Sequence, residues 1–416
     1  MKMKRKKLHI RRCLMNFQVL IIGSDANAYY MARASYEAYR KKAHLIAKNR
    51  LAFTKFSNIL TIEYHDDLWE EEAFVQILNQ YAKDHPEKIL TISTNETYSL
   101  FLARNQQKLR ENLIFFHQEE KKILSLMNKE LFYKTYKNSC LSFPETYYFD
   151  IEKDSIIPTM NYPMIVKPAN VISYNHIQFE GKKKIYKIKS QKELEKTIAL
   201  IKKSGYKDRL ILQEFISGDD SHLFDCVVYV DRNLKVKVIS FAQIGIQERT
   251  KSMVGNAAAL INSLNTFDGD SETSKKNIIK FMENLGMNGF FEIDMKYDEK
   301  TKEFKVLEIN ARQGRCSYYL VPLKANLVKI MAEDLIFHHD LPFMDLKEKV
   351  LLSFIPKKVL IKYCSNEEFK KEALRLWKNR VSPMQCPLDK NFKRFLMMKK
   401  RLWHYHKEYE NSDWEE

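Results

Sequence analysis

GFFEIDMKYD, from Gly289 to Asp298, and FKVLEIN, from Phe304 to Asn310, are the stretches that decide the fold. Both alternate apolar and polar residues with the period of two that is typical of half-buried strands. The polar link between them predicts a turn, so we expect the two strands to pair as an antiparallel hairpin. Folding about the middle of the link places Asp294 opposite Glu308 or one residue away from it, on the face that carries Asn310.

Two carboxylates and an amide on one face predict a metal site. Carboxylates this close repel one another unless a cation lies between them, and hard oxygen ligands suit Mg²⁺ that carries substrate phosphates. We therefore expect Asp294, Glu308 and Asn310 to hold Mg²⁺. The alternative is an exposed strand face with scattered charges. It is disfavoured because Glu308 and Asn310 alternate with apolar residues and lead directly into RQGR at 312–315.

The composition describes an ordinary globular protein. The chain has 416 residues, enough for two or three domains, with 45% hydrophobic and 30% charged residues. No apolar run approaches the roughly 20 residues of a membrane span, and no signal-peptide pattern follows the first charges, so we expect a cytoplasmic protein. The cysteines form no CxxC pair, which favours reduced thiols over disulfides or zinc ligands. They are Cys13, Cys140, Cys226, Cys316, Cys364 and Cys386.

The net charge of +17 is concentrated in part at two places. Residues 1–14 form a basic leader, which we expect to be disordered. A second basic stretch, Lys390–Arg401, interleaves apolar and basic residues. It could dock on anionic lipid headgroups or attract an anionic substrate, and the favoured alternative is an amphipathic helix packed on the body with a solvated basic face. Nucleic acid is not expected as a partner, because no binding motif for it is present.

Residues 15–125 are predicted to form an open parallel α/β domain, because short apolar runs alternate there with helix-like segments. Ligands bind beyond the carboxyl ends of the strands in such sheets. The segment GSDAN after the run Phe17–Ile22 lies at such an end, which makes Ser24 and Asp25 candidate substrate residues. A plain strand-to-helix turn is the alternative. A single glycine does not make a dinucleotide fingerprint.

Two α+β units follow, over 126–212 and 213–340, and a basic, aromatic extension completes the chain over 341–416. In the first unit we expect a helix from residue 120 through Asn138, a buried strand Met164–Pro168, and a hairpin of Ile177–Glu180 with Lys184–Lys189. The capping box at Ser190 and Glu193 predicts a further helix. Hairpin-forming strands at 224–230 and 235–241 are expected in the second unit.

Several residues are suited to binding a nucleoside triphosphate. Lys167 ends a buried strand, where its ammonium could reach phosphates, although a lysine at a strand end is often merely solvated. The polar segment Pro168–Lys184, which contains Lys182, could fold over phosphates or be an ordinary surface hairpin. Gln213–Asp220 runs from a strand into an acidic turn, which suits hydrogen bonds to a base edge and to ribose hydroxyls.

Taken in order, these pieces resemble the ATP-grasp superfamily, in which two α+β subdomains clamp ATP after an N-terminal α/β domain. The resemblance covers about residues 15–340. It is carried by four segments in the right order: MIVKP at 164–168, QEFISGDD at 213–220, FEIDMK at 291–296 and EINAR at 308–312. One departure is that the usual glycine- and serine-rich phosphate loop is replaced by residues 170–182, with Gly181 as its only glycine.

The resemblance implies a cofactor and a set of roles. ATP and Mg²⁺ would be bound, with Lys129, Lys167 and Lys182 near the phosphates, Gln213 and Glu214 by the adenine and Asp220 by the ribose. Asp294, Glu308 and Asn310 would hold Mg²⁺, and Arg312 would steady the oxyanion of the reaction centre.

More narrowly, the chain is similar to bacterial D-aspartate ligases, which attach D-aspartate to the lysine of a peptidoglycan precursor. The segments behind this similarity include GSDANAYYMAR at 23–33, GDDS at 218–221 and EINARQGRCS at 308–317. By this similarity a small-molecule acid and an amine acceptor, a peptidoglycan precursor linked to UDP, are the partners. Arg315 and Ser317 are candidates for holding the acid.

The expected reaction is ATP-dependent ligation of a carboxylate to an amine through an acyl phosphate, with Lys167 and Arg312 as catalytic residues. The alternative within this class joins a different amino acid to a free amino acid or another amine. A different class is a basic protein without catalytic activity that binds nucleic acid or a membrane surface.

Overall fold

The computed structural model describes residues 17–154, 157–159, 161–169, 173–174, 177–183, 185–249, 253, 255–382 and 385–412. The predicted basic leader therefore lies outside the described residues. The described cysteines, Cys140, Cys226, Cys316, Cys364 and Cys386, are free thiols, as the sequence predicts. No helix in the described ranges is long and apolar enough to cross a membrane.

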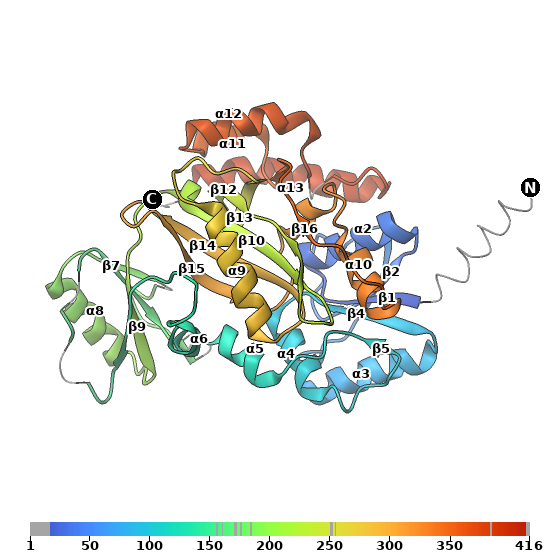
Figure 1. The fold of residues 1–416 in the computed structure, drawn as a ribbon, viewed down its shortest axis with the longest axis horizontal. Helices are drawn as coiled ribbons and strands as arrows, with labels where there is room; N and C mark the ends of the chain where they lie inside the picture. Colours follow the sequence, from blue (N-terminus) through green and yellow to red (C-terminus); the bar gives the residue numbers. More distant parts are fainter. Residues whose placement is uncertain are drawn as a thin grey trace, which may run out of the picture.

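A parallel five-stranded sheet forms the N-terminal part, which confirms the predicted open α/β fold. Its strand order is β3-β2-β1-β4-β5, with β1 in the centre (Figure 1). Asp25 caps the helix that follows β1, because its carboxylate accepts a hydrogen bond from the Ala28 backbone amide. The elements are β1 (Phe17–Ile22), α2 (Ala26–Tyr39), β2 (Ala43–Ala47), β3 (Leu60–Tyr64), α3 (Glu71–Asp84), β4 (Lys88–Ser93), α4 (Glu96–Asn105) and β5 (Leu113–Ile114).

A small antiparallel sheet with the strand order β6-β9-β7-β8 follows two short helices. The single helix predicted from residue 120 through Asn138 is wrong, because Asn128 leaves the helical conformation and caps a second helix through Leu131 N. The elements are α5 (Glu120–Met127), α6 (Lys129–Tyr136), β6 (Thr146–Asp150), β7 (Met164–Pro168), β8 (Tyr186–Ile188), α8 (Gln191–Lys203) and β9 (Arg209–Glu214).

The predicted hairpin of Ile177–Glu180 with Lys184–Lys189 is also wrong. Residues 177–180 form no strand, and of the second segment Tyr186–Ile188 forms β8, which pairs with β7. Ile177 and Phe179 pack against the core of the small sheet instead of pairing. The burial of these two side chains therefore replaces a hydrogen-bonded ladder.

An eight-stranded sheet carries the rest of the molecule, with the path β15-β14-β10-β12-β13-β17, with β11 beside β10 and with β16 beside β11. The predicted hairpins are both present, as β10–β11 and β14–β15. The elements are β10 (Leu223–Val230), β11 (Val236–Ile239), β12 (Ala242–Gln247), β13 (Ala257–Asn262), α9 (Ser271–Leu285), β14 (Gly289–Asp298), β15 (Glu303–Asn310), α10 (Leu327–Met331), β16 (Met344–Asp345) and β17 (Leu351–Ser353).

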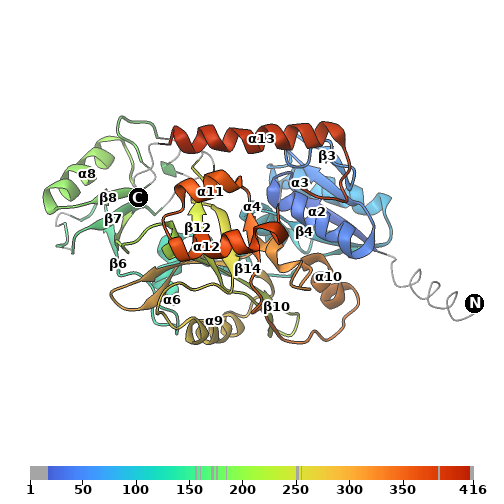
Figure 2. The same cartoon turned by 90° about the horizontal axis from the view of Figure 1, so that it is seen from above.

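Three helices of the C-terminal extension cover this sheet: α11 (Lys357–Tyr363), α12 (Glu367–Leu376) and α13 (Phe392–Glu410). The longest, α13, runs along one edge of the molecule from the N-terminal sheet toward the small sheet (Figure 2). One continuous core joins buried residues of α2, the large sheet and α13. We propose a boundary between the two α+β units after Glu214, because the predicted one at residue 212 falls inside β9.

Candidate active site

Carboxylates from three neighbouring strands stand in one row across the large sheet. Asp294 on β14 pairs in register with Glu308 on β15, which confirms the predicted juxtaposition of these two residues. On its other side Asp294 pairs with Asp225 on β10. Asn310 pairs with Glu292 one step along, and its amide lies 3.4 Å from the Asp294 carboxyl. Alternation along the strands therefore collects these side chains on one face.

The carboxylate row would place more negative charge on a buried surface than is stable without a proton or a cation. Burial, with the charges of Glu292 and Glu308, raises the pKa of Asp294 well above its usual range, so that it keeps its proton and donates a hydrogen bond to Glu308. Burial and Glu292 likewise raise the pKa of Asp225, whose Oδ1 has no hydrogen-bond partner in the described part of the chain. A cation could replace the shared proton, so the donor set fits the predicted Mg²⁺.

The predicted ligand set contains two carboxylates and one amide. Within the described ranges, no group of three or more His, Cys, Asp or Glu side chains is placed to hold a metal ion. The assignment of Asp294, Glu308 and Asn310 to Mg²⁺ therefore stays a prediction.

Two lysines from separate elements approach the carboxylate row. Lys129, at the start of α6, places its Nζ 2.6 Å from Glu308 Oε2. Its charge, opposed by burial, lowers the pKa of Glu308 to about 2. Burial disfavours the lysine cation, yet Glu308 outweighs this effect and raises the pKa of Lys129. This ion pair ties α6 to β15 across the site.

Lys167, on β7, lies beside this pair. Its Nζ donates to Gln213 Oε1 at 2.8 Å and lies 5.4 Å from the centre of the Tyr133 ring. Burial, together with the charge of Lys129, lowers the pKa of Lys167 to about 7. An ammonium with so little compensation attracts an anion, as the predicted phosphate contact requires.

Gln213 and Glu214 form the end of β9, and their contact with a base stays a prediction. The Gln213 amide donates to Thr146 Oγ1 at 2.8 Å, so its side chain bridges Lys167 and β6. Glu214 accepts hydrogen bonds from Lys305 Nζ at 2.8 Å and from the Glu145 amide at 3.1 Å. Both side chains are thus held in fixed positions beside the lysine pair.

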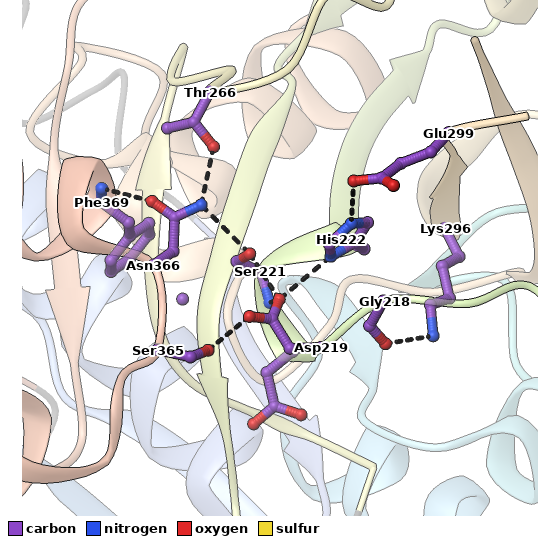
Figure 3. Close-up of polar contacts among 12 residues, drawn as sticks. Gly218, Asp219, Ser221, His222, Thr266, Lys296, Glu299, Ser365, Asn366 and Phe369 are labelled. Carbon is purple, nitrogen blue, oxygen red and sulfur yellow. Dashed lines mark hydrogen bonds and ion pairs between the residues drawn. The ribbon is translucent and has the colours of Figure 1, made fainter. Parts of the chain in front are cut away.

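The turn after β9 is fastened from two sides (Figure 3). His222 lies 3.0 Å from Asp219 Oδ1 through Nδ1 and 3.1 Å from Glu299 Oε1 through Nε2. Burial opposes the imidazolium, but the hydrogen bonds to Asp219 and Glu299 raise the pKa of His222. On the opposite side, Ser365 of the C-terminal extension donates to Asp219.

Two further contacts fix this turn. Gly218 has a φ of +104°, and a Cβ there would lie 2.3 Å from the His222 ring, so the position requires glycine. Lys296 donates to the Gly218 carbonyl at 3.0 Å, and burial lowers the pKa of Lys296 to about 8. The turn is therefore bound to the β14–β15 hairpin on one side and to the extension on the other.

Asp220, the predicted ribose residue, is buried. Its carboxylate accepts from the Gln247 amide at 2.8 Å, from the Gln247 side chain at 2.7 Å and from Arg249 at 2.8 Å. These contacts join the turn to β12. Contact with a ribose stays a prediction.

Arg312 links the carboxylate row to the N-terminal sheet. Its guanidinium lies 2.6 Å from Glu96 on α4 and 3.3 Å from Glu292 on β14. Burial disfavours the cation, but the two carboxylates raise its pKa, so Arg312 stays charged. Gly314, which follows, faces Glu292 so closely that a Cβ there would lie 1.5 Å from Oε1. This loop thus sets the positions of Glu292 and Arg312 together.

Arg315 reaches the opposite side of the loop. It donates to Glu248 Oε1 at 2.6 Å and to the Ala257 carbonyl at 3.0 Å, and it stacks 3.8 Å from the Phe354 ring. Its Nε and Nη1 have no hydrogen-bond partner among the described residues, and neither does Glu248 Oε2. Tyr405 of α13 donates to Glu248 at 3.0 Å. Unsatisfied buried donors beside an unsatisfied acceptor suit a ligand with both charges, such as an amino acid.

The remaining predicted residues contact loops and backbone groups around the site. Ser24 donates to the Asn49 carbonyl, and Ser317 accepts from the Gly314 amide at 2.8 Å, so both stabilise loops. Burial raises the pKa of Asp25, with the charges of Arg312 and Arg315 opposing the shift. Lys182 donates to the Ile177 carbonyl at 2.5 Å, within the segment predicted to cover phosphates.

Several charged residues of the site are absent from the sequence predictions, among them Asp225, His222, Glu248 and Glu292. Glu292 shares the alternating face of Asp294, and this pattern could have revealed it. Asp225 lies within an almost continuous apolar run, FDCVVYV, where a single carboxylate is itself a signal of function. The roles of His222 and Glu248 could not be predicted locally, because each depends on a partner that is distant in sequence.

The ATP-grasp domain model matches residues 126–314, which include every strand of the carboxylate row. The D-aspartate ligase of Enterococcus faecium is 30% identical over 408 residues, covering 94% of this chain and 95% of the relative. The chain belongs to the ATP-grasp ligases. This ATP-grasp ligase is also 26% identical over 173 residues to a D-alanine–D-alanine ligase of Synechococcus, covering 41% of this chain and 45% of that protein.

Solved structures show the same fold at lower identity. The L-amino acid ligase of Bacillus licheniformis superposes with a TM-score of 0.57 at 16% identity, covering 77% of this chain and 74% of that one. The N5-carboxyaminoimidazole synthetase of Staphylococcus aureus gives 0.58 at 15% identity, with 85% and 89% covered. By its domain match and its D-aspartate ligase relative, this ATP-grasp ligase is an ATP-dependent enzyme that forms carbon–nitrogen bonds between a carboxylate and an amine.

Proposed function

We propose that this ATP-grasp ligase joins D-aspartate to the lysine side-chain amine of a peptidoglycan precursor, a UDP-linked muramyl pentapeptide. The observation that carries this proposal is the 30% identity to a D-aspartate ligase across 94% of the chain. The arrangement of Arg315 and Glu248 supports it, because their unsatisfied atoms suit the carboxylate and the ammonium of an amino acid.

The residues of the site have distinct tasks in this reaction. The carboxylate of the acid takes the γ-phosphate of ATP, which gives ADP and an acyl phosphate, and the amine then displaces phosphate. We propose that Lys129 and Lys167 hold the phosphates while Gln213 and Glu214 orient the base and Asp220 the ribose. Lys182 would lie over the phosphates. Arg312, fixed between Glu96 and Glu292, would stabilise the oxyanion that forms on amine attack.

We propose that Mg²⁺ is held by Asp294, Glu308 and Asn310. When bound there, it would neutralise phosphate charge. Asp294 would then give up the proton that it shares with Glu308, since a cation removes the repulsion that raises its pKa. Ser24, Asp25 and Ser317 would support the substrate loop around Arg315.

ADP release measures this function directly. Purified protein with Mg²⁺ and ATP is mixed with a panel of D- and L-amino acids, with and without a muramyl pentapeptide that contains lysine. We expect ADP release with D-aspartate only when the pentapeptide is present, together with a product whose mass is increased by one aspartyl residue. A matched pentapeptide with acetylated lysine should give no product, because its side chain lacks the free amine.

Other outcomes separate the levels of the proposal. Turnover with another amino acid, or with a free amino acid as acceptor, would overturn the substrate assignment. The ligase class itself would then stand. Absence of acid-dependent ADP release under every combination would overturn the catalytic roles of the site.

A further inference from the structure

The helix α13 uses one of its faces to bind the body of the protein. It has 19 residues, which corresponds to about 28 Å, and Figure 2 shows it along one edge of the molecule. Its buried residues are Arg394, Met398, Tyr405 and Tyr409. Arg394 pairs with Asp389 at 3.0 Å, and Tyr409 donates to the Gln247 carbonyl at 2.5 Å. The helix is therefore fixed at both ends, and its opposite face is directed outward.

Four large apolar side chains lie on this outward face. Phe392 is 74% exposed, Trp403 56%, Phe395 53% and Leu396 51%. Phe56, which is 41% exposed, adjoins them because Arg394 hydrogen-bonds the carbonyls of the loop before it. We call this set, together with the lysines Lys393, Lys399, Lys400 and Lys407, the outer face of α13. Exposed apolar side chains that gather on one helix face are typical of an interaction surface.

The lysines of the outer face lie among its aromatic rings. Lys407 Nζ is 4.5 Å from the centre of the Trp403 ring, Lys399 is 5.4 Å from Phe395, and Lys393 is 5.9 Å from Phe56. The exposed acid near the end of the helix, Glu410, is paired with Lys362 at 3.5 Å. The outer face therefore combines positive charge with apolar side chains from Phe392 to Lys407.

Such a combination fits an anionic lipid surface better than nucleic acid. Aromatic and leucine side chains enter the region between headgroups and acyl chains, while lysines extend to the headgroup phosphates. The arginines of α13, which would recognise nucleic acid phosphates most strongly, are engaged with the protein: Arg394 contacts Asp389, and Arg401 stacks 4.6 Å from the Phe53 ring.

We propose that the outer face of α13 docks the enzyme on the surface of an anionic lipid bilayer. The helix would lie flat in the headgroup region, with Phe392, Phe395, Leu396 and Trp403 inserted and the lysines bound to phosphates. This assignment does not depend on which acid and amine the enzyme joins. The proposal explains why the basic stretch 390–401 carries exposed apolar residues. A solvated basic helix face would not require them.

Vesicle flotation tests the proposal with the full chain. We expect the protein to float with vesicles of phosphatidylcholine and phosphatidylglycerol and to stay behind with phosphatidylcholine alone. Binding should weaken as salt is raised, because headgroup attraction is screened. The double variant Phe395→Ser/Trp403→Ser should bind anionic vesicles at least about 10-fold more weakly, because two exposed apolar side chains would no longer enter the lipid.

The matched control is Phe343→Ser, since Phe343 is 54% exposed on another part of the surface. It should bind vesicles as the parent does. All variants should keep the parent's ADP release in solution without vesicles, which shows that they fold and that a failure of docking is separate from a failure of the proposed function.

Three results would overturn the proposal: no flotation with anionic vesicles, equal binding by the double variant and the parent, or preferential retention on a duplex or single-stranded oligonucleotide in competition with vesicles.

Discussion

At the residue scale the site depends on the charge of Glu308. Its carboxylate pairs with Lys129 on one side and accepts a hydrogen bond from the protonated Asp294 carboxyl on the other. These partners come from α6 and β14, so a single side chain connects the helix to the sheet. The predicted roles of Glu308 and of Lys167 can each be tested with one substitution.

Glu308→Gln keeps the shape of the side chain and removes its charge. We expect ATP-dependent turnover to fall by at least about 100-fold, as for the loss of other electrostatic contacts at reaction centres. ADP release at saturating substrates measures this effect, and circular dichroism checks the fold. Glu303→Gln is the matched control, because Glu303 lies exposed on the same strand. Turnover of the Glu308 variant at the level of the control would contradict the metal assignment.

The lowered pKa of Lys167 predicts that binding of ATP is coupled to proton uptake. With a pKa of about 7, its amine is mostly neutral at pH 8, and a bound triphosphate would raise that pKa and restore the ammonium. In the absence of Mg²⁺, whose binding would release the proton of Asp294, we expect uptake of about one proton for each ATP bound at pH 8. Calorimetry in buffers of different ionisation enthalpy measures it.

The variant Lys167→Arg should take up close to no proton, since a guanidinium is always charged. Lys153→Arg, on a side chain that is 79% exposed, serves as the control and should behave as the parent. Equal uptake by Lys167→Arg and the parent would show that another group takes up the proton.

At the scale of elements, His222 is one of the residues that hold the turn between β9 and β10 (Figure 3). His222 connects Asp219 of the turn to Glu299 in the link between β14 and β15. His222 thus adds contacts on both sides of its ring that depend on its protonation, beside the other contacts that hold the turn.

The stability that His222 contributes should depend on pH in a definite direction. Its pKa is raised in the folded protein, so the contribution is complete below the unfolded pKa of about 6.5 and is lost as pH rises through the folded value. We expect His222→Gln to lower the free energy of unfolding by about 1 to 3 kcal/mol at pH 6 and by much less at pH 9. Urea unfolding at the two pH values measures this difference.

His339→Gln provides the control for this experiment, because His339 lies on the surface next to Glu333. A deficit of the His222 variant that stayed constant from pH 6 to pH 9 would mean that the ring acts by packing alone.

At the scale of the whole molecule, residues just before α13 join the extension to the N-terminal sheet. The Asp389 carboxylate accepts from Tyr29 at 2.9 Å, Ser57 at 2.8 Å and the Asn58 amide at 2.7 Å, and it pairs with Arg394 at 3.0 Å. The other end of α13 reaches Glu248, beside Arg315. The extension therefore spans the N-terminal sheet and the large sheet and contributes Tyr405 to the candidate site.

Asp389→Asn should destabilise the protein by about 3 kcal/mol, because the buried Arg394 cation would lose its charge partner. Urea unfolding followed by tryptophan fluorescence measures the loss. Asp340→Asn is the control and should change the free energy of unfolding by no more than about 0.5 kcal/mol, since the Asp340 side chain is 89% exposed. Equal midpoints for the two variants would refute the role of Asp389 in joining the two parts.

The sequence by itself determined the parts of the fold that depend on short-range patterns. Alternation and a polar turn placed Asp294 opposite Glu308, because the members of a hairpin are only a few residues apart. The parallel α/β sheet followed in the same way from its rhythm of apolar runs. The break at Asn128 is also a local signal: its side chain caps α6 through the Leu131 amide three residues on, and this cap divides the one predicted helix into two.

Only the tertiary structure decided which groups share the site. Lys129 meets Glu308 across 179 residues, and Tyr405 meets Glu248 across 157 residues. Such contacts carry no periodic signal in the chain, because they form only when separate elements are packed together. The same holds for α13: its composition shows that it is basic and apolar, and packing alone determines that Arg394 is buried while Phe392, Leu396 and Trp403 are left exposed.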